Sequence, residues 1–380
     1  MMNQNFILPN FKNSIVNLAA TMEQFLGKKP QHATLPFLST KLNSKIKNIV
    51  YLIIDGMGTR ILEKNLSVQS FLRRHHIQTI TSVFPSTTTA ATTALVSART
   101  SSEHGWFAWA LDFDGTVVEL FRNRNYYTKE FLSDPDFIAK NLPYEHIFEN
   151  HKTSRTIYNC FPKIQCKGHS KNEIEYRSFG QMIHKLHKTC RQPNDKFIYA
   201  YFPDLDSTMH KYGTQHHKVR HLLKKIDRKL AHLVRHTPDS LFVITADHGQ
   251  IDTKGNVFIC DDQAIQECLE HPMAWDSRVV SFKIKKNYDD KFKEAFAKYS
   301  TDFALFTPET LIQQGLFGAT KMKPQLRKLM GDYIAIGTET GKRFITKKLT
   351  PKKIKKLDRG IHSGMTADEM YVPVIIAKGE

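Results

Sequence analysis

The most informative stretch of this 380-residue chain is Asn48-Ile-Val-Tyr-Leu-Ile-Ile54, which runs directly into Asp55-Gly56-Met57-Gly58. A run that is almost wholly apolar, rather than alternately apolar and polar, is typical of a strand buried on both faces. Three further runs have this character: residues 197–202, 241–245 and 371–377. Pro373 places the last run near a sheet edge or a bulge, because proline has no N–H to donate. The runs predict an α/β fold with helices on both faces of a sheet.

The segments between these runs carry apolar residues at intervals of three and four, as on one face of a helix. The clearest case is residues 217–236, where the opposite face is rich in Lys and Arg. This helix is predicted to end before Thr237-Pro238. We find no internal repeat, and we interpret residues 1–380 as a single catalytic domain.

The one shift in composition comes late, in a Lys-rich stretch over roughly residues 278–359. Its last part, residues 342–359, holds nine basic residues and one acidic residue, Asp358. A solvated basic face, with Thr350-Pro351 opening a helix, accounts for most stretches of this kind. The alternative is a small inserted cap that closes over an anionic substrate.

The overall composition is that of a folded, basic protein. The chain has 55 Lys plus Arg and 37 Asp plus Glu, a net charge of +18, and 41% hydrophobic residues, which excludes a disordered polycation. No apolar stretch approaches the ~18 residues of a membrane span, and no signal peptide is recognisable. The five cysteines form no CxxC pair and are interpreted as reduced thiols. We therefore predict a cytoplasmic protein without a transmembrane segment.

Three of the apolar runs end in a carboxylate: Asp55, Asp206 and Asp247. Ligands of open α/β sheets bind at the carboxyl ends of the strands, so these acids are expected to meet in one crevice. Three carboxylates repel one another unless a cation compensates them. Because His210 and His248 lie beside two of these acids, the sequence predicts a metal site.

The spacing of these residues suits chelation. Asp206 and His210 stand at i and i+4, so one turn of helix places both on the same face. Asp247 and His248 are adjacent, and Gly249 permits a sharp turn in which both side chains point inward. A sixth candidate ligand is His362, in Gly-Ile-His-Ser-Gly before the last strand.

A hydroxyl-rich turn, Phe84-Pro-Ser-Thr-Thr-Thr, leads into an Ala-rich helix. Free N–H groups and the helix dipole at such a start favour both a capping role and a bound phosphate. Capping explains one hydroxyl of the four, which are Ser86, Thr87, Thr88 and Thr89. One of them can also act as a nucleophile if a metal ion lowers its pKa.

Together these segments resemble the alkaline phosphatase superfamily, and most closely its type I phosphodiesterase/nucleotide pyrophosphatase branch. Five segments carry the resemblance in the family's order: IIDGMG, FPSTTTAATT with SSEHG, DSTMHKYG, TADHG and GIHSG. The resemblance implies an alkaline-phosphatase-like fold, a central and mostly parallel sheet with helices on both faces and a small inserted cap or subdomain. It also implies two divalent metal ions. These are usually zinc in the family, and manganese also suits such ligands.

The resemblance assigns a residue to each role. The first metal would be held by Asp55, Asp247, His248 and the oxygen of the nucleophile, and the second by Asp206, His210 and His362. The nucleophile falls on Thr88, four residues after Phe84, with Ser86, Thr87 and Thr89 as alternatives in a neighbouring register. A phosphothreonine intermediate follows from this assignment.

The chain departs from the family pattern at two places in the following helix. Ala91 stands where the phosphodiesterases carry an Asn whose amide helps to hold the phosphoryl oxygen. Loss of such a donor can lower a rate by ~10²–10³-fold, so either a neighbour such as Thr92 replaces it or the substrate binds differently. Ser97-Ala98 likewise replaces a Thr-Gly pair. Both differences indicate a divergent subgroup.

The implied activity is hydrolysis of phosphoric esters, as a phosphodiesterase or nucleotide pyrophosphatase acting on an anionic, phosphorylated small molecule. Three other activities of the superfamily stay open: phosphomonoesterase, phosphonate hydrolase and phosphomutase. A non-catalytic basic binding protein is a further alternative, although no stable nucleic-acid complex is expected because no stacking-aromatic motif is present. Arg122 and Arg124 are either ordinary surface residues or a grip for a second phosphate.

Overall fold

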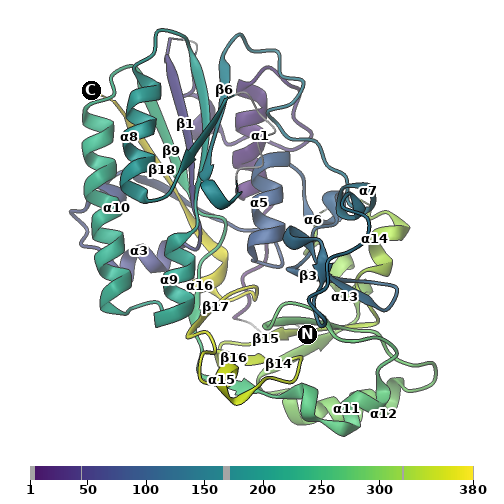
Figure 1. Cartoon of the computed structure of the whole chain (residues 1–380). Coiled ribbons are helices and arrows are strands. Elements are labelled where there is room, and N and C mark those ends of the chain that lie inside the picture. Colours follow the sequence, from purple (N-terminus) through teal and green to yellow (C-terminus); the bar gives the residue numbers. More distant parts are fainter. Residues whose placement is uncertain (1–4, 44, 166–171, 319–320, 380) are drawn as a thin grey trace.

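The computed structural model describes residues 5–43, 45–165, 172–318 and 321–379. Its centre is a sheet of seven strands in the order β2-β18-β9-β1-β8-β6-β7 (Figure 1). The strands are β2 (His76–Thr81), β18 (Tyr371–Lys378), β9 (Ser240–Thr245), β1 (Asn48–Ile54), β8 (Lys196–Phe202), β6 (Thr156–Pro162) and β7 (Glu173–Tyr176). β18 pairs antiparallel with both neighbours, whereas the other pairings are parallel. The sheet is therefore mostly parallel, as predicted.

The position of Pro373 differs in part from the prediction. β18 lies inside the sheet, between β2 and β9, and not at an edge. The pairing of β18 with β2 shifts register between Val374 and Ile375, directly after Pro373. An irregular ladder tolerates the missing N–H, so the bulge alternative is confirmed and the edge alternative is wrong.

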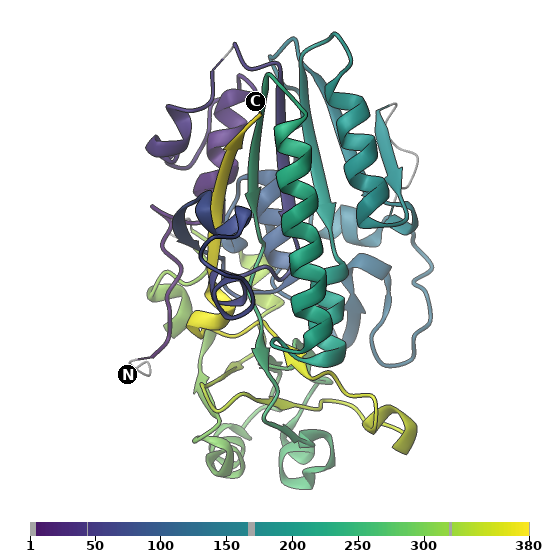
Figure 2. The same cartoon turned by 90° about the vertical axis from the view of Figure 1, so that its left-hand side faces the viewer.

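Helices cover both faces of the sheet, and the predicted α/β fold is confirmed. α8 (Phe179–Cys190) and α10 (His217–Arg235) lie on one face, and α1 (Ile15–Phe25) and α5 (Thr88–Ser97) lie on the other (Figure 1). Figure 2 shows α10 running the length of the sheet. The buried residues of α10 recur at helical spacing: Val219, Leu223, Ile226, Leu230, Leu233 and Val234. α10 ends one residue before the predicted His236, which is its C-cap.

A smaller antiparallel sheet lies beyond the carboxyl ends of the parallel strands (Figures 1 and 2). Its order is β12 (Ala274–Trp275), β13 (Val279–Phe282), β15 (Tyr333–Gly337) and β14 (Phe303–Phe306). α11 (Gln263–Cys268) and α12 (Asp289–Phe296) pack on it with a separate core that includes Phe282, Phe292 and Phe296. Pro351 opens α15 (Pro351–Ile354), as predicted. The action of residues 278–359 as a cap over a substrate stays a prediction.

A third sheet, β3 (Ala110–Phe113), β4 (Thr116–Glu119) and β5 (Arg124–Asn125), lies beside the smaller sheet. One hydrophobic cluster joins the two, because Phe107 stacks on Trp275 and contacts Phe317. The smaller sheet and the third sheet therefore share one core.

Four cysteines, Cys160, Cys190, Cys260 and Cys268, are buried free thiols, whereas Cys166 lies outside the described residues. Within the described ranges, none of the helices is both long enough and apolar enough to cross a membrane. The cytoplasmic location stays a prediction.

Candidate active site

The ends of three neighbouring strands bring the predicted acids together. Asp55 follows β1, Asp247 follows β9, and Asp206 lies in α9 (Asp204–Tyr212), which begins just after β8. Because β8, β1 and β9 are adjacent and parallel, their carboxyl ends meet at one edge of the sheet. The three acids therefore converge as predicted.

Asp55, Asp247 and His248 form the first of two groups, here called the strand-end cluster. Their ligand atoms all lie within 4.8 Å of one another, and all three residues are buried. His248 Nε2 is 3.4 Å from Asp55 Oδ1 and 3.5 Å from Asp247 Oδ2. Three ligand atoms thus surround one small volume.

In each carboxylate of the strand-end cluster, one of the two oxygens accepts hydrogen bonds. The Tyr201 hydroxyl donates to Asp55 Oδ2, and the backbone N–H groups of Gly56 and His248 donate to Asp247 Oδ1. By contrast, Asp55 Oδ1 and Asp247 Oδ2 are buried without a hydrogen-bond partner. Burial and the charges of Asp247 and Asp206 raise the pKa of Asp55 well above its usual value. Unpartnered buried carboxylate oxygens beside an imidazole fit a bound divalent cation.

Asp206, His210 and His362 form the second group, here called the helix-and-loop cluster, and their ligand atoms also lie within 4.8 Å of one another. His210 Nε2 is 3.3 Å from Asp206 Oδ2 across one turn of α9, and the side chain of His210 is 27% exposed. Burial lowers the pKa of His210, but the charge of Asp206 outweighs it and raises the pKa to about 9. The two clusters touch, because the rings of His248 and His362 stack at 3.9 Å.

All three histidines are oriented in the same way. The Nδ1 atoms of His210, His248 and His362 lie 2.7, 3.0 and 3.2 Å from the backbone oxygens of Gly360, Gly249 and Ser86. A backbone carbonyl only accepts, so each Nδ1 carries a proton and Nε2 is the ring atom left to bind a metal ion. Such partners fix tautomer and ring orientation in metal-binding histidines. This orientation has no signal in the sequence.

Position 249, directly after His248, requires a glycine, but for a reason other than the predicted one. Its φ does not lie in the left-handed region, but an added Cβ would lie 2.0 Å from the backbone oxygen of Asp368. Its N–H donates to Glu369 O at 2.8 Å. Gly249 is therefore required by close packing and not by a turn of unusual backbone angles.

Among the four hydroxyl candidates, Thr88 contacts the strand-end cluster. Thr88 is the first residue of α5, and its Oγ1 is 3.1 Å from His248 Nε2. The Ser86 hydroxyl donates to Gly364 O, and the Thr87 hydroxyl lies beside the Asp276 carboxylate. The Thr89 hydroxyl is buried without a partner. The geometry favours Thr88 over its neighbours.

The structure also bears on the missing amide at Ala91. Ala91 is fully buried in α5. Thr92, the suggested replacement, donates its hydroxyl to the backbone oxygen of Thr88 at 2.6 Å. The Thr92 hydroxyl is therefore already bonded to the backbone of α5, and in this conformation it does not replace the Asn amide as a donor to the phosphoryl oxygen.

A buried ion pair that the sequence did not indicate joins the smaller sheet to both clusters. Arg278, just before β13, and Glu369, in α16 (Ala367–Met370), are fully buried and bonded at 2.7 and 3.0 Å. The Glu369 carboxylate also accepts from the N–H of Gly364, two residues after His362. Since Gly249 donates to its backbone oxygen, Glu369 contacts the segments behind both His248 and His362.

Arg122 and Arg124 are not independent surface residues. Both contact the carboxylate of Glu119, at 3.4 and 2.7 Å. The predicted binding site for a second phosphate therefore includes the carboxylate of Glu119 beside the two guanidinium groups.

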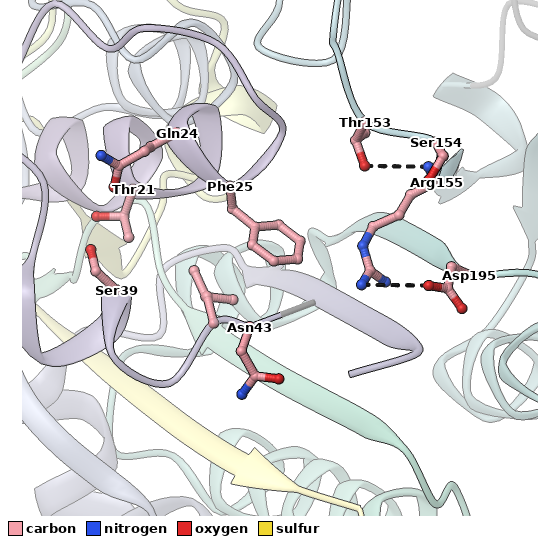
Figure 3. A pocket seen from close by; sticks show the side chains of 10 residues that line it. Thr21, Gln24, Phe25, Ser39, Asn43, Thr153, Ser154, Arg155 and Asp195 are labelled. Atoms are coloured by element: carbon pink, nitrogen blue, oxygen red, sulfur yellow. Dashed lines mark hydrogen bonds and ion pairs between the residues drawn. The ribbon is translucent and has the colours of Figure 1, made fainter. Parts of the chain in front are cut away.

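A cavity of about 450 Å³ lies at the other end of the sheet. In Figure 3 the ring of Phe25 faces the ion pair of Arg155 and Asp195. Arg155 also donates to the backbone oxygen of Lys47, which directly precedes β1, so this cavity is at the amino ends of the strands. Neither potential metal cluster found among the described residues lies there.

Comparisons with known proteins identify the family of this chain. Residues 49–356 match the type I phosphodiesterase / nucleotide pyrophosphatase family. A segment of 85 residues is 33% identical to ectonucleotide pyrophosphatase/phosphodiesterase family member 7 of Rattus norvegicus; it covers 21% of this chain and only 19% of that relative.

Solved structures share the fold at low sequence identity. Murine ectonucleotide pyrophosphatase / phosphodiesterase 5 superposes with a TM-score of 0.61 at 15% identity, covering 87% of this chain and 88% of that chain. Phosphonoacetate hydrolase from Sinorhizobium meliloti 1021, in complex with phosphonoacetate, gives a TM-score of 0.62 at 15% identity, covering 88% and 91%. These likenesses establish the fold alone. The match over residues 49–356 establishes the family, and the chain belongs to the type I phosphodiesterase / nucleotide pyrophosphatase family of the alkaline phosphatase superfamily.

Proposed function

We propose that this protein is a metal-dependent phosphoric ester hydrolase, a phosphodiesterase or nucleotide pyrophosphatase with Thr88 as its nucleophile. The observation that carries the proposal is the position of Thr88 Oγ1, 3.1 Å from His248 Nε2 in a cluster with two unpartnered carboxylate oxygens. The substrate class is an anionic, phosphorylated small molecule.

Two divalent metal ions fit the residues present. The strand-end cluster with Thr88 would hold one ion, and the helix-and-loop cluster would hold the other. Mixed carboxylate and imidazole ligands suit zinc, and manganese is the alternative. When bound, the ions supply positive charge that lowers the pKa of the nucleophile and stabilises the attacking and leaving oxygens of an in-line displacement.

The chain itself supplies the nucleophile and the phosphoryl site. The Thr88 hydroxyl releases its proton to solvent and its oxygen forms a bond to phosphorus, while the bond from phosphorus to the leaving oxygen breaks and the leaving group takes a proton from solvent. Backbone N–H groups in the first turn of α5 are suited to hold the non-bridging oxygens. Water then attacks the same phosphorus, the bond from phosphorus to the Thr88 oxygen breaks, and the Thr88 oxygen takes up a proton, so that the product is released and the hydroxyl is restored.

Hydrolysis of bis-(4-nitrophenyl) phosphate tests this proposal together with metal content by mass spectrometry. Wild type is expected to carry close to two metal ions per chain and to hydrolyse the diester. Thr88→Ala is expected to lose at least ~10³-fold in kcat, since it removes the nucleophile. Thr92→Ala, the same substitution one turn along α5, is the matched control and is expected to stay within a few-fold of wild type. Equal activity of Thr88→Ala and wild type would reject Thr88 as the nucleophile.

A second candidate function is hydrolysis of a phosphomonoester or phosphonate. Ala91 favours it, because the amide that the diesterases place at this position is missing. Paired mono- and diester nitrophenyl substrates separate the two activities, and a preference for the monoester would replace the first proposal with the second.

We also propose that residues 278–359 belong to the same catalytic domain and act as its cap. The ion pair between Arg278 and Glu369 supports this role, because it links the smaller sheet to the loop that carries His362.

A further inference from the structure

A cluster of cations lies on the third sheet, around a single carboxylate. Glu119, at the end of β4, has a side chain that is only 2% exposed. It contacts Arg122 at 3.4 Å, Arg124 at 2.7 Å, and Lys129. Three cations therefore share one carboxylate.

A fourth cation comes from a distant segment of the chain. Lys347 follows β16 (Lys342–Phe344), and its Nζ lies 3.9 Å from the centre of the Tyr126 ring. Lys129 Nζ lies 4.6 Å from the same ring. In the part of the chain that the structure describes, no carboxylate comes within ion-pair distance of Lys347. Two lysines from distant segments thus contact the same ring, that of Tyr126. The carboxylate beside them, Glu119, is already paired with other cations.

The surroundings of Lys347 disfavour the charged form of its side chain. Burial lowers its pKa, and the neighbouring Lys129 lowers it further, to about 8, although Glu119 acts in the opposite direction. A half-buried ammonium next to a second ammonium is stabilised when an anion binds between them. Among the described residues, Glu119 is the carboxylate within ion-pair distance of these cations, so the cluster has a surplus of positive charge.

A chain of contacts connects the cation cluster with the segment that carries the proposed nucleophile. The guanidinium of Arg122 lies 5.3 Å from the centre of the Trp109 ring, and the backbone N–H of Trp109 donates to the carboxylate of Asp276 at 3.3 Å. The same carboxylate lies beside the hydroxyl of Thr87, which directly precedes Thr88. Trp109 and Asp276 therefore lie between the cluster and the start of α5.

Asp276 also links the cation cluster to the metal-ligand clusters electrostatically. Its charge adds to the rise that burial causes in the pKa of Tyr126, the ring that Lys129 and Lys347 contact. His248 and His210 in turn lower the pKa of Asp276, although burial raises it overall. Asp276 therefore lies within electrostatic range of both groups of residues.

We propose that Arg122, Lys129 and Lys347 bind a second anionic group of the substrate, a carboxylate or phosphate set apart from the reacting phosphoryl group. The proposal rests on the proposed function for the position of that phosphoryl group. It narrows the substrate class to small molecules that carry two separated anionic groups.

Binding calorimetry with ligands that contain no phosphoric ester bond tests this site without ester hydrolysis. The ligands are propylphosphonate, ω-carboxyalkylphosphonates and alkane-α,ω-diyl bisphosphonates, the last two with spacers of several lengths. Wild type, loaded with metal, is expected to bind one ligand with a second anion at least ~10-fold more tightly than propylphosphonate. The preferred second group identifies carboxylate or phosphate as the natural one.

Lys347→Ala and Arg122→Ala are expected to reduce that ratio of affinities to near one. Lys348→Ala, the exposed neighbour of Lys347, is the matched control and is expected to keep the ratio. Equal binding of all three ligand classes by wild type would overturn the proposal, as would an equal loss in Lys347→Ala and Lys348→Ala. A retained ratio in a protein that does not hydrolyse bis-(4-nitrophenyl) phosphate would support the anion site and reject the proposed function alone.

Discussion

The two metal-ligand clusters have similar ligands but different surroundings. The strand-end cluster follows two adjacent strands of the main sheet, and both of its carboxylates keep one oxygen hydrogen-bonded and one oxygen free. The helix-and-loop cluster takes its residues from α9 and from the loop after β17 (Gly360–Ile361), and its Asp206 is already paired with His210. The first cluster is a fixed, uncompensated negative site, whereas the second is partly compensated and more exposed.

The largest effect that this comparison predicts concerns Asp247→Asn and Asp206→Asn. Both should lower phosphodiesterase activity by at least ~10³-fold, because each removes a charged metal ligand. The metal-free proteins should differ in stability. Asp247→Asn relieves the repulsion with Asp55 and should raise Tm by about 2 °C or more, whereas Asp206→Asn leaves His210 without its partner and should lower Tm.

Differential scanning calorimetry in the presence of a chelator provides the measurement for this pair. If both variants moved Tm in the same direction by similar amounts, the two clusters would not differ in charge compensation.

The next effect concerns Glu369, which contacts the segments behind both clusters in different ways. Its side chain holds Gly364, next to the His362 loop, but only its backbone oxygen holds Gly249. Glu369→Gln should therefore reduce metal affinity at the helix-and-loop cluster by about 10–100-fold and change the strand-end cluster much less. Breaking the buried pair with Arg278 should also cost about 3–5 kcal/mol of unfolding free energy.

Titration with a chelating dye, which resolves the two ions by affinity, measures this difference. Glu103→Gln is the control, because Glu103 has the same capping-box role at α6 (Ser101–His104), away from both clusters. A proportional loss at both metal sites in Glu369→Gln would contradict the proposed asymmetry.

The smallest effect is a pH dependence of the metal-free protein that comes from His210 in the helix-and-loop cluster. The pKa of His210 is raised to about 9, above its unfolded value near 6.5. Its stabilising contribution, roughly 2–3 kcal/mol, is therefore complete below pH 6.5 and is lost as the pH rises through 9. Urea unfolding between pH 6 and 10 should show this loss in wild type but not in His210→Asn. His184→Asn, at an exposed histidine, should behave like wild type.

Much of this site was predictable because it follows strand ends. Continuous apolar runs identify buried parallel strands, and a polar residue directly after such a run must lie at the carboxyl edge of the sheet. Asp55 and Asp247 were found in this way, and the i, i+4 spacing in α9 located Asp206 and His210. The placement of Thr88 and His362 depended on the resemblance to the family, since their own local patterns left alternatives.

The parts that could not be predicted depend on contacts between distant segments. Arg278 and Glu369 lie 91 positions apart, and neither has a neighbouring motif that indicates a buried ion pair. Lys129 and Lys347 meet over Tyr126 only after the smaller sheet has folded against β3, β4 and β5. Gly249 was correctly singled out, but its physical role depends on Asp368, which the local sequence does not contain.

The most direct test of the account is anomalous diffraction at the zinc absorption edge from crystals of the metal-loaded protein. The account predicts two peaks. One should lie among Asp55 Oδ1, Asp247 Oδ2, His248 Nε2 and Thr88 Oγ1, and the other among Asp206, His210 Nε2 and His362 Nε2. A single peak, or coordination through a different hydroxyl of the turn at residues 86–89, would contradict it.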